Sequence, residues 1–421
     1  MDFPTFSSAY STFLWSAFAL AFVLGFIANK TNFCTMGAVS DWVNMGDTGR
    51  FRAWLLAIAV ALLGVVILEK VGVVDAGSTF PPYRSGSFVW AENLLGGLLF
   101  GVGMTLASGC GNKTLVRIGG GNIKSIFVAI VIAVIAYFMV NPFPGSDQTL
   151  FTTLFYGWIR PLAIDLGPAQ DVGALITSEE NVVNARLVIG GLLALILLTY
   201  VFKSAEFRKS IDNILGGFVV GLVVLAAWYV TSNIGVNLDD ASHTLQSYAQ
   251  DWDFLAESEE GKPADSRPLA AQSFTFINPM GQTAGYVSTG FNSTFLTFGL
   301  MSVLGVVAGS FIWSVVSRSF RIEWFASTRD FFTHLVGAIL MGFGGVLAMG
   351  CTIGQGITGI STLALGSFIV FFSIVLSSAL TMKVQYYKLV YEAEATFLDA
   401  FLTSLVDLRL LPSAMRRLDA V

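Results

Sequence analysis

The sequence has few charged side chains and few cysteines for its length. Asp, Glu, Lys and Arg together make up 12% of the 421 residues, about half their share in a typical soluble domain. A soluble globular protein is therefore excluded. Only three cysteines are present, so a disulfide framework cannot form, and the odd count leaves at least one thiol free.

Signatures of catalysis and of cofactor binding are also absent. The sequence has no phosphate loop of the form G-x-x-x-x-G-K-[ST], so ATP is not expected to drive the protein directly. It has no C-x-x-C motif, which argues against a thioredoxin-type enzyme. His243 and His334 lie apart from any cysteine cluster and do not make a convincing zinc site. We therefore expect no metal, no cofactor, no nucleic-acid partner and no enzymatic activity.

What the sequence does contain is largely apolar, with 54% hydrophobic residues and a mean hydropathy of +0.71. Nine apolar runs are long enough to approach or span a bilayer, and all 11 prolines lie outside them, as expected of helices. The runs lie near residues 13–29, 53–68, 93–108, 125–140, 186–202, 213–231, 291–316, 332–349 and 362–382. They predict an all-α polytopic membrane protein with about nine transmembrane helices in one integral membrane domain. Glu69 and Glu92, at the ends of two runs, are expected to be solvated at the membrane interface.

The distribution of charge predicts the orientation. Basic residues cluster at 203–209 and at 318–329, whereas residues 236–270 hold eight acidic side chains and two basic ones. Positive charge favours the cytoplasmic side of a membrane. We therefore predict a multi-pass protein of the cell inner membrane, with an acidic extracytoplasmic loop at about 236–290 and a cytoplasmic C-terminus.

An internal repeat relates two parts of the chain. Residues 94–110 align without gaps on residues 335–351, and both copies end in Gly-Cys. A weaker copy ends at Cys34, and the fourth copy has Val230 at the cysteine position. The flanking charges predict that corresponding copies run in opposite directions, as in an inverted-topology repeat with a substrate site near the membrane midplane. The alternative is that these glycine-rich helices only pack closely.

Polar, glycine-rich segments follow Cys34 and Cys110 in the first half (residues 1–202) and Cys351 in the second half (residues 203–421). Irregular backbone at membrane depth is tolerated only inside protein or along a cavity, so we predict short re-entrant helices and loops there. Thiols are weak donors and soft acceptors, and exposed N–H groups at such turns attract anions. The segments thus predict a site for an anionic, sulfur-containing ligand. The supporting loop residues are expected to be Thr35, Gly109, Gly111, Asn112, Lys113, Gly350, Thr352 and Gln355.

The chain resembles the YeeE/YedE family of membrane proteins, the sulfur-transport family, in three stretches: 32–42, 107–112 and 349–356. The resemblance implies an hourglass-like helical fold with inward-dipping loops, and uptake of thiosulfate. It also implies that Cys34, Cys110 and Cys351 form a central relay that passes the ion along through S–H···S hydrogen bonds. Some members of the family work with a small TusA-like sulfur-carrier protein, which is a candidate cytoplasmic partner beside the membrane lipid.

The direction of the repeats predicts that an inward-moving ion meets Cys351 first, then Cys34 and Cys110. Three alternatives stay open. The substrate could be a sulfite or selenium species. The cysteines could belong to a membrane sulfurtransferase or thiol redox protein that forms a persulfide. The protein could also be a scaffold or a gas-permeable channel.

Overall fold

A computed structural model describes residues 1–238, 241–252, 268–392 and 394–419 of the chain. Within these ranges, nine helical stretches are long and apolar enough to cross a membrane. Their long helices are α1 (Phe6–Lys30), α3 (Gly49–Lys70), α4 (Trp90–Leu106), α6 (Ile123–Val140), α9 (Val182–Lys203), α11 (Ile211–Asn233), α14 (Phe298–Val316), α15 (Thr328–Leu347) and α16 (Leu365–Val390). Each corresponds to one predicted apolar run, so the predicted all-α polytopic membrane fold is confirmed.

Shorter elements connect the long helices. The short helices are α2 (Thr35–Ser40), α5 (Gly111–Gly119), α7 (Gly157–Ile159), α8 (Val172–Ile176), α10 (Ala205–Lys209), α12 (Leu245–Gln250), α13 (Ile277–Ser288), α17 (Phe397–Asp407) and the π-helical turn η7 (Gly354–Gly359). One small sheet has β1 (Asp2–Phe3) parallel to β4 (Gly235–Leu238), which pairs antiparallel with β5 (Ala241–Thr244). In a second sheet, β2 (Ser87–Phe88) pairs antiparallel with β3 (Ile164–Asp165).

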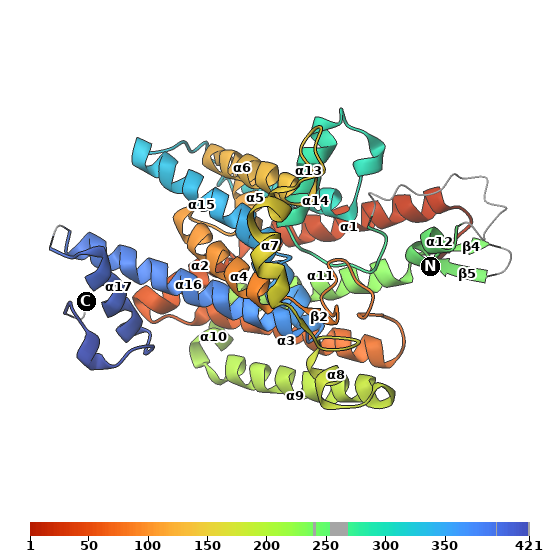
Figure 1. Cartoon of the computed structure of the whole chain (residues 1–421), viewed down its shortest axis with the longest axis horizontal. Helices are drawn as coiled ribbons and strands as arrows, with labels where there is room; N and C mark the ends of the chain where they lie inside the picture. Colours follow the sequence, from red (N-terminus) through yellow and green to blue (C-terminus); the bar gives the residue numbers. More distant parts are fainter. Residues whose placement is uncertain (239–240, 253–267, 393, 420–421) are drawn as a thin grey trace.

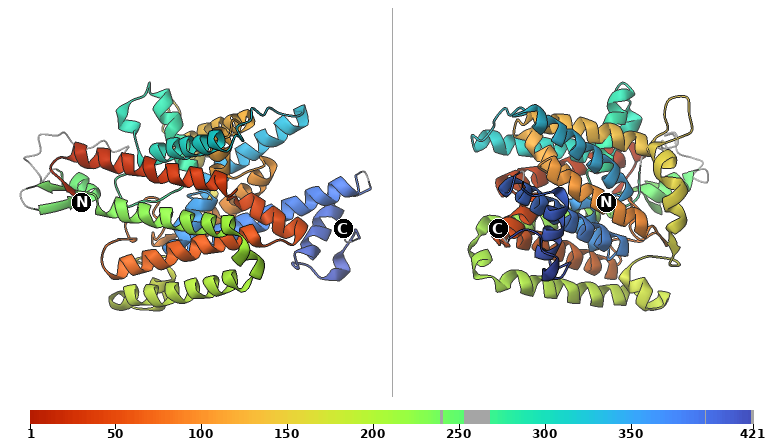
Figure 2. Two further views of the ribbon diagram at one scale, coloured as in Figure 1. Left: turned by 180° about the vertical axis from the view of Figure 1, so that it is seen from behind. Right: turned by 60° about the vertical axis from the view of Figure 1, so that its left-hand side comes forward.

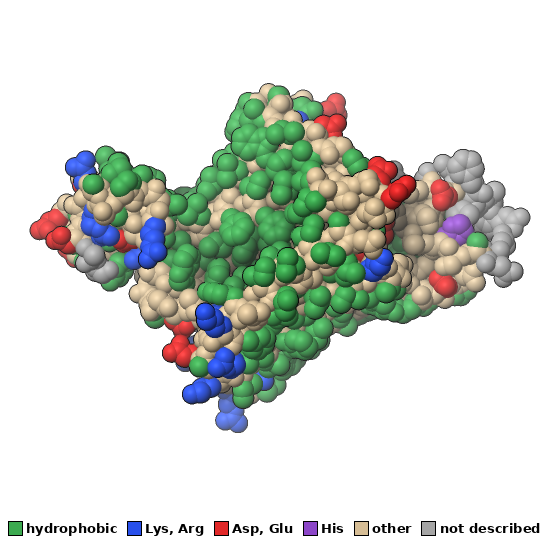
Figure 3. Space-filling model, turned by 90° about the horizontal axis from the view of Figure 1, so that it is seen from below, with side chains coloured by type: hydrophobic (Ala, Val, Ile, Leu, Met, Phe, Trp, Pro, Cys, Tyr) green, Lys and Arg blue, Asp and Glu red, His purple; other side chains and the backbone are tan. Residues whose placement is uncertain are grey.

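The long helices set the shape of the molecule. Helices α1, α3, α9, α11 and α16 run along its longest axis, with the N-terminus and the β4–β5 hairpin toward one end and α17 at the other (Figures 1 and 2). Hydrophobic side chains cover the middle of the face in Figure 3, and charged side chains gather toward its ends. This is the distribution expected of a protein that sits across a bilayer.

Helices α4 and α15 pack closely through glycines. A methyl group added at Gly96 would lie 2.8 Å from the carbonyl oxygen of Gly344, and one at Gly103 would lie 2.7 Å from that of Gly337. The contacts are reciprocal, because methyl groups at Gly337 and Gly344 would each lie 2.7 Å from the carbonyl oxygens of Gly103 and Gly96. The two helices are therefore antiparallel, with their backbones in contact. The inverted repeat itself stays a prediction, and these reciprocal contacts are consistent with it.

The segment predicted as an acidic loop at 236–290 contains ordered structure. It includes most of the β4–β5 hairpin, α12 and α13, while residues 253–267 lie outside the described ranges. Helix α13 packs against α6 and α14, and its residues Ile277 and Met280 are buried. The prediction of a loop throughout this segment is therefore wrong for α13, which belongs to the helical core, while the side of the membrane on which the segment lies stays a prediction.

We expect a large side chain at Gly337 to destabilise the fold. In Gly337→Leu, the new Cβ would lie 2.6 Å from the backbone nitrogen of Ala107, and such overpacking typically costs about 1–3 kcal/mol. The matched control is Gly191→Leu in α9, where an added methyl meets no atom within 4 Å. Thermal unfolding of the purified protein should show a lower Tm only for Gly337→Leu. An equal fall in both variants would contradict the close approach of α4 and α15.

Candidate functional site

The same helix-ending turn precedes each of the three cysteines. Two residues before them, Asn32, Ser108 and Met349 have left-handed backbones, with φ of 51°, 56° and 54°. The next amide in each turn donates to a carbonyl five residues earlier: Phe33 to Ala28 at 3.0 Å, Gly109 to Met104 at 2.8 Å and Gly350 to Gly345 at 2.8 Å. This closure satisfies carbonyls that the helix end would leave unpaired. The helix breaks predicted at the cysteines are thus present.

Each cysteine then starts a new helical segment and is buried. Cys34 and Cys110 are the N-cap residues of α2 and α5. The amide of Gly37 donates to the sulfur of Cys34 at 3.4 Å, and the amide of Gly354 donates to the sulfur of Cys351 at 3.5 Å. The three thiols are at most 4% exposed, and all three are free.

The Cys110 turn approaches the turns of the other two cysteines. A methyl group on Gly111, the residue after Cys110, would lie 3.9 Å from the Cβ of Cys351. Lys113 of the same helix, α5, donates to the side-chain oxygen of Asn32 in the Cys34 turn at 2.6 Å. The order in which an ion would meet the thiols, expected as Cys351, Cys34 and Cys110, stays a prediction.

Buried polar atoms without a protein partner surround the thiols. Among the described residues, no hydrogen bond reaches the side-chain oxygens of Thr35, Asn112, Thr352 and Thr275. The Thr352 hydroxyl lies near the Cys110 thiol, and the Thr275 hydroxyl lies near the Cys351 thiol, but neither contact has the geometry of a hydrogen bond. Unpaired polar groups are rare in protein interiors, so a set of them around one spot indicates a place for a polar ligand or for water.

The structure thus places the predicted Thr352 beside the Cys110 thiol, and it adds Thr275, which the sequence analysis missed. Thr35 and Asn112 are buried within two positions of Cys34 and Cys110, and their contact with a ligand stays a prediction. Thr275 lies in the predicted acidic loop, 76 positions before Cys351. No spacing or motif in the sequence connects it to the cysteines.

Gln355 and Gly350 support the turn at Cys351. The Gln355 amide donates to the carbonyl of Ala348 and accepts a hydrogen bond from Ser367 at 2.6 Å. A methyl group at Gly350 would lie 3.2 Å from the Gln355 side chain. Gln355 therefore braces the turn. Its predicted contact with a ligand stays a prediction.

Positive charge gathers on the Cys34 side of the site. The ammonium group of Lys113 donates to the side-chain oxygen of Asn32 at 2.6 Å, which ties α5 to the Cys34 turn. Arg117 approaches the same place, since a methyl group at Gly109 would lie 3.7 Å from one of its nitrogens. Arg50 is paired with the buried Asp41. Within the described ranges, no carboxylate forms an ion pair with Lys113 or Arg117, so this side can attract an anion.

Comparison with known proteins identifies the family of the chain. The sequence matches the family model described as sulphur transport over residues 30–380. The chain belongs to the sulphur transport family. It is 26% identical to the thiosulfate transporter TsuA of Escherichia coli (strain K12) over 351 residues, which cover 80% of this chain and 84% of that protein.

A second relative is the thiosulfate transporter TsuA of Spirochaeta thermophila (strain ATCC 700085 / DSM 6578 / Z-1203). It is 21% identical over 369 residues, covering 85% of this chain and 94% of the relative. The resemblance expected from the cysteine motifs is confirmed. Both relatives are named as transporters, which agrees with the expectation that the chain is not an enzyme.

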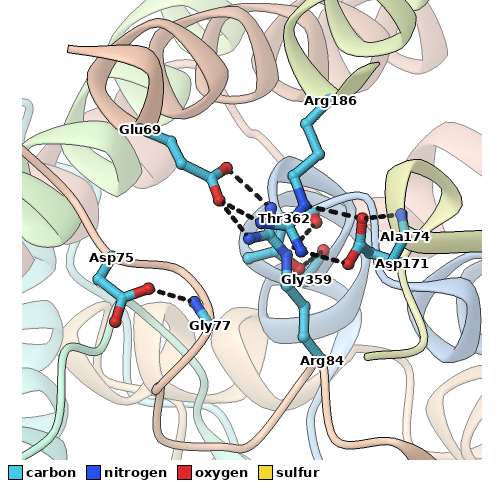
Figure 4. A network of polar contacts seen from close by, with 9 residues as sticks. All are labelled: Glu69, Asp75, Gly77, Arg84, Asp171, Ala174, Arg186, Gly359 and Thr362. Atoms are coloured by element: carbon cyan, nitrogen blue, oxygen red, sulfur yellow. Dashed lines mark hydrogen bonds and ion pairs between the residues drawn. The ribbon is translucent and has the colours of Figure 1, made fainter. Parts of the chain in front are cut away.

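In this member of the sulphur transport family, a buried ion cluster holds the loop that follows Cys351 (Figure 4). Arg84 binds Glu69 at 2.6 Å and 3.0 Å, and Arg186 binds Glu69 at 2.7 Å. Arg186 also binds Asp171 at 2.9 Å and 2.6 Å. Arg84 donates to the carbonyl of Thr362 at 2.8 Å. The cluster thus connects α3, the segment at Arg84, the residue before α8, and α9 to the chain at Thr362.

The expected solvation of Glu69 and Glu92 is wrong. The side chain of Glu69 is 7% exposed inside the cluster, and the buried Glu92 pairs with Arg160 at 3.1 Å. Both acids lie at helix ends, as the sequence indicated. Their arginine partners, which come from other segments of the chain, neutralise them and allow their burial.

We expect Asp171→Asn to lower the free energy of unfolding by about 3–5 kcal/mol, because it leaves buried arginines without their counter-charge. Burial alone would raise the pKa of Asp171, but hydrogen bonds from Arg186 and the charges of Arg84 and Arg186 hold it below its ordinary value of 3.8. The carboxylate therefore stabilises the fold fully above about pH 4, and this stabilisation is lost as the pH falls through the lower folded pKa.

The measurement is Tm as a function of pH. The wild type should lose stability on acidification more steeply than Asp171→Asn. The control, Asp147→Asn, changes an exposed carboxylate and should follow the wild type. A wild-type-like profile for Asp171→Asn would exclude a stabilising role for the cluster.

Proposed function

We propose that the protein takes up thiosulfate, or a close sulfur oxyanion, across the cell inner membrane through a relay of Cys34, Cys110 and Cys351. The observation that carries the proposal is the approach of the Cys110 turn to the turns of two other buried cysteines. The unpartnered side-chain oxygens beside the thiols support it. The sulfane end of thiosulfate meets S–H groups, and its oxyanion end meets hydroxyl and N–H donors.

The relay requires no covalent step. In each turn the cysteine starts a helical segment whose first amides lack helix partners, so N–H donors lie beside the thiol. The ion exchanges one set of weak donors for the next. Antiparallel, reciprocal packing of α4 and α15 supports an inverted-topology arrangement of residues 1–202 and 203–421 around this path.

The two ends of the path differ in charge. Lys113 and Arg117 lie on the Cys34 side, which we assign to the cytoplasm together with the C-terminus. The hairpin at the other end then faces outward, and a TusA-like carrier is the candidate recipient of the ion inside the cell. An apolar groove of about 590 Å³, lined by α6, α13 and α14, supports contact with membrane lipid.

The cysteine relay predicts a large loss of uptake when either of two of its thiols is removed. Cys110→Ala and Cys351→Ala should each reduce labelled thiosulfate uptake at least tenfold, because the ion loses one binding position inside a dry path. The control is Ser302→Ala, which shortens a buried side chain in α14 whose hydroxyl bonds only within its own helix. Unimpaired uptake by both cysteine variants would contradict the proposed relay.

The same preparations separate passage from chemistry. After exposure to thiosulfate, mass spectrometry of the wild type should find no cysteine carrying an extra sulfur atom. A stable persulfide on one cysteine would instead favour the sulfurtransferase alternative. Competition by sulfite and selenium oxyanions in the uptake assay would rank the substrates.

Lys113 should raise the local concentration of the anion. Lys113→Gln keeps a donor for Asn32 but removes the charge, so we expect the KM for thiosulfate to rise several-fold and its dependence on salt to weaken. The control, Lys203→Gln, removes an exposed charge at the end of α9. Identical KM values and salt dependence for the wild type and Lys113→Gln would show that the charge serves only to link the two loops.

A further inference from the structure

The packing of ten helices pairs five elements of one half with five of the other. Helix α1 packs on α14, and its counterpart α11 packs on α3, the counterpart of α14. In the same way α4 packs on α16, and its counterpart α15 packs on α6, the counterpart of α16. Helix α2 packs on α3 and α16, and α13 packs on α14 and α6. Under this pairing, α13 occupies in the second half the place that α2 occupies in the first.

The counterpart of Cys34 is therefore at the start of α13 and not in α11. Cys34 is the N-cap residue of α2, and Phe276 is the N-cap residue of α13. Val230, the position expected from the sequence, lies within the continuous helix α11 (Ile211–Asn233). The residues between α11 and α13 have no equivalent between α1 and α2, so an alignment of the sequence alone places the counterpart too early in the chain.

Thr275, the residue before this N-cap, lies against Cys351. Its side chain fits between two glycines of the Cys351 turn: a methyl at Gly350 would lie 3.3 Å from its hydroxyl oxygen, and one at Gly354 would lie 2.7 Å from its Cβ. The hydroxyl lies near the thiol. Thr275 is 6% exposed, and its hydroxyl has no hydrogen-bond partner among the described residues.

The neighbouring segment is held in place by bonds that leave this hydroxyl free. The amide of Gln272 donates to the hydroxyl of Thr231 at 3.0 Å, and the hydroxyl of Ser273 donates to the carbonyl of Val224 at 2.9 Å. The hydroxyl of Thr358 donates to the carbonyl of Phe274 at 2.8 Å. A small cavity beside Thr275 is lined also by Phe80 and Gln272.

We propose that Thr275, one residue before the position that corresponds to Cys34, is a fourth binding position of the path, where its hydroxyl donates to an oxygen of the anion beside Cys351. The proposal rests on the proposed uptake function. It assigns the end of the path remote from Lys113 a preference for the oxygen atoms of the ligand, because an alcohol O–H is a stronger donor to oxygen than a thiol. Binding there orients the sulfane end toward the Cys351 thiol.

The test compares three substitutions at this position in the full-length protein. Thr275→Val keeps the shape and removes the hydroxyl, so the KM for thiosulfate should rise roughly tenfold or more with a smaller change in maximal rate. Thr275→Ser should restore the wild-type KM. Thr275→Cys places a fourth thiol in the path and should give an intermediate KM.

The matched control is Thr283→Val in α13, whose hydroxyl bonds the carbonyl of Pro279 at 2.8 Å and should leave KM unchanged. Tm values of all variants report folding. If Thr275→Val folds and has the wild-type KM, or if Thr275→Ser fails to restore it, the fourth position is refuted while the uptake function stands. If the wild type takes up no thiosulfate, the proposed function fails first and this inference with it.

Discussion

The structure depends on the need to pair backbone polar groups wherever a helix is broken at membrane depth. An unpaired N–H or C=O group in a bilayer costs several kcal/mol, so a break survives only if its ends find partners. At each cysteine, a left-handed residue closes the preceding helix onto its own carbonyls. The cysteine then begins a new helical segment. The proposed site uses this solution, because a closed turn in the protein interior presents N–H groups, a thiol and small polar side chains at one place.

A second constraint is close packing without large side chains. Glycines let the backbones of α4 and α15 meet, and this brings the turns that follow the two helices together. Gly111 illustrates the result, since even a methyl group there would lie 3.0 Å from Ile277 and 3.9 Å from the Cβ of Cys351. Side chains from α5, α13 and the Cys351 loop therefore meet at one point. The ion cluster around Glu69 fixes the end of the Cys351 loop, because Arg84 binds both Glu69 and the carbonyl of Thr362.

The spanning helices could be predicted because hydropathy acts residue by residue along the chain. The cysteine turns could be predicted because polar, glycine-rich segments interrupt those helices locally. Thr275 could not, because its position beside Cys351 depends on a contact between segments far apart in the sequence. The acidic composition of residues 236–270 led to the prediction of a loop that extended over α13, which begins just after them. Glu69 was misjudged for the same reason: a carboxylate at a helix end is solvated unless a distant arginine reaches it, and here Arg84 and Arg186 do.

Neutral donors suit a path for a multiply charged anion. A fixed positive charge in a low-dielectric interior would hold such an ion strongly, whereas passage requires binding that is favourable enough to enter and weak enough to leave. The turns at Cys34, Cys110 and Cys351 contain no carboxylate to repel the ion. Lys113 and Arg117 lie toward one end of the proposed path. Along that path, weak donors would bind the ion loosely at each position and the fixed charge would favour movement toward the basic end. The thiols suit the soft sulfur atom of the proposed ion.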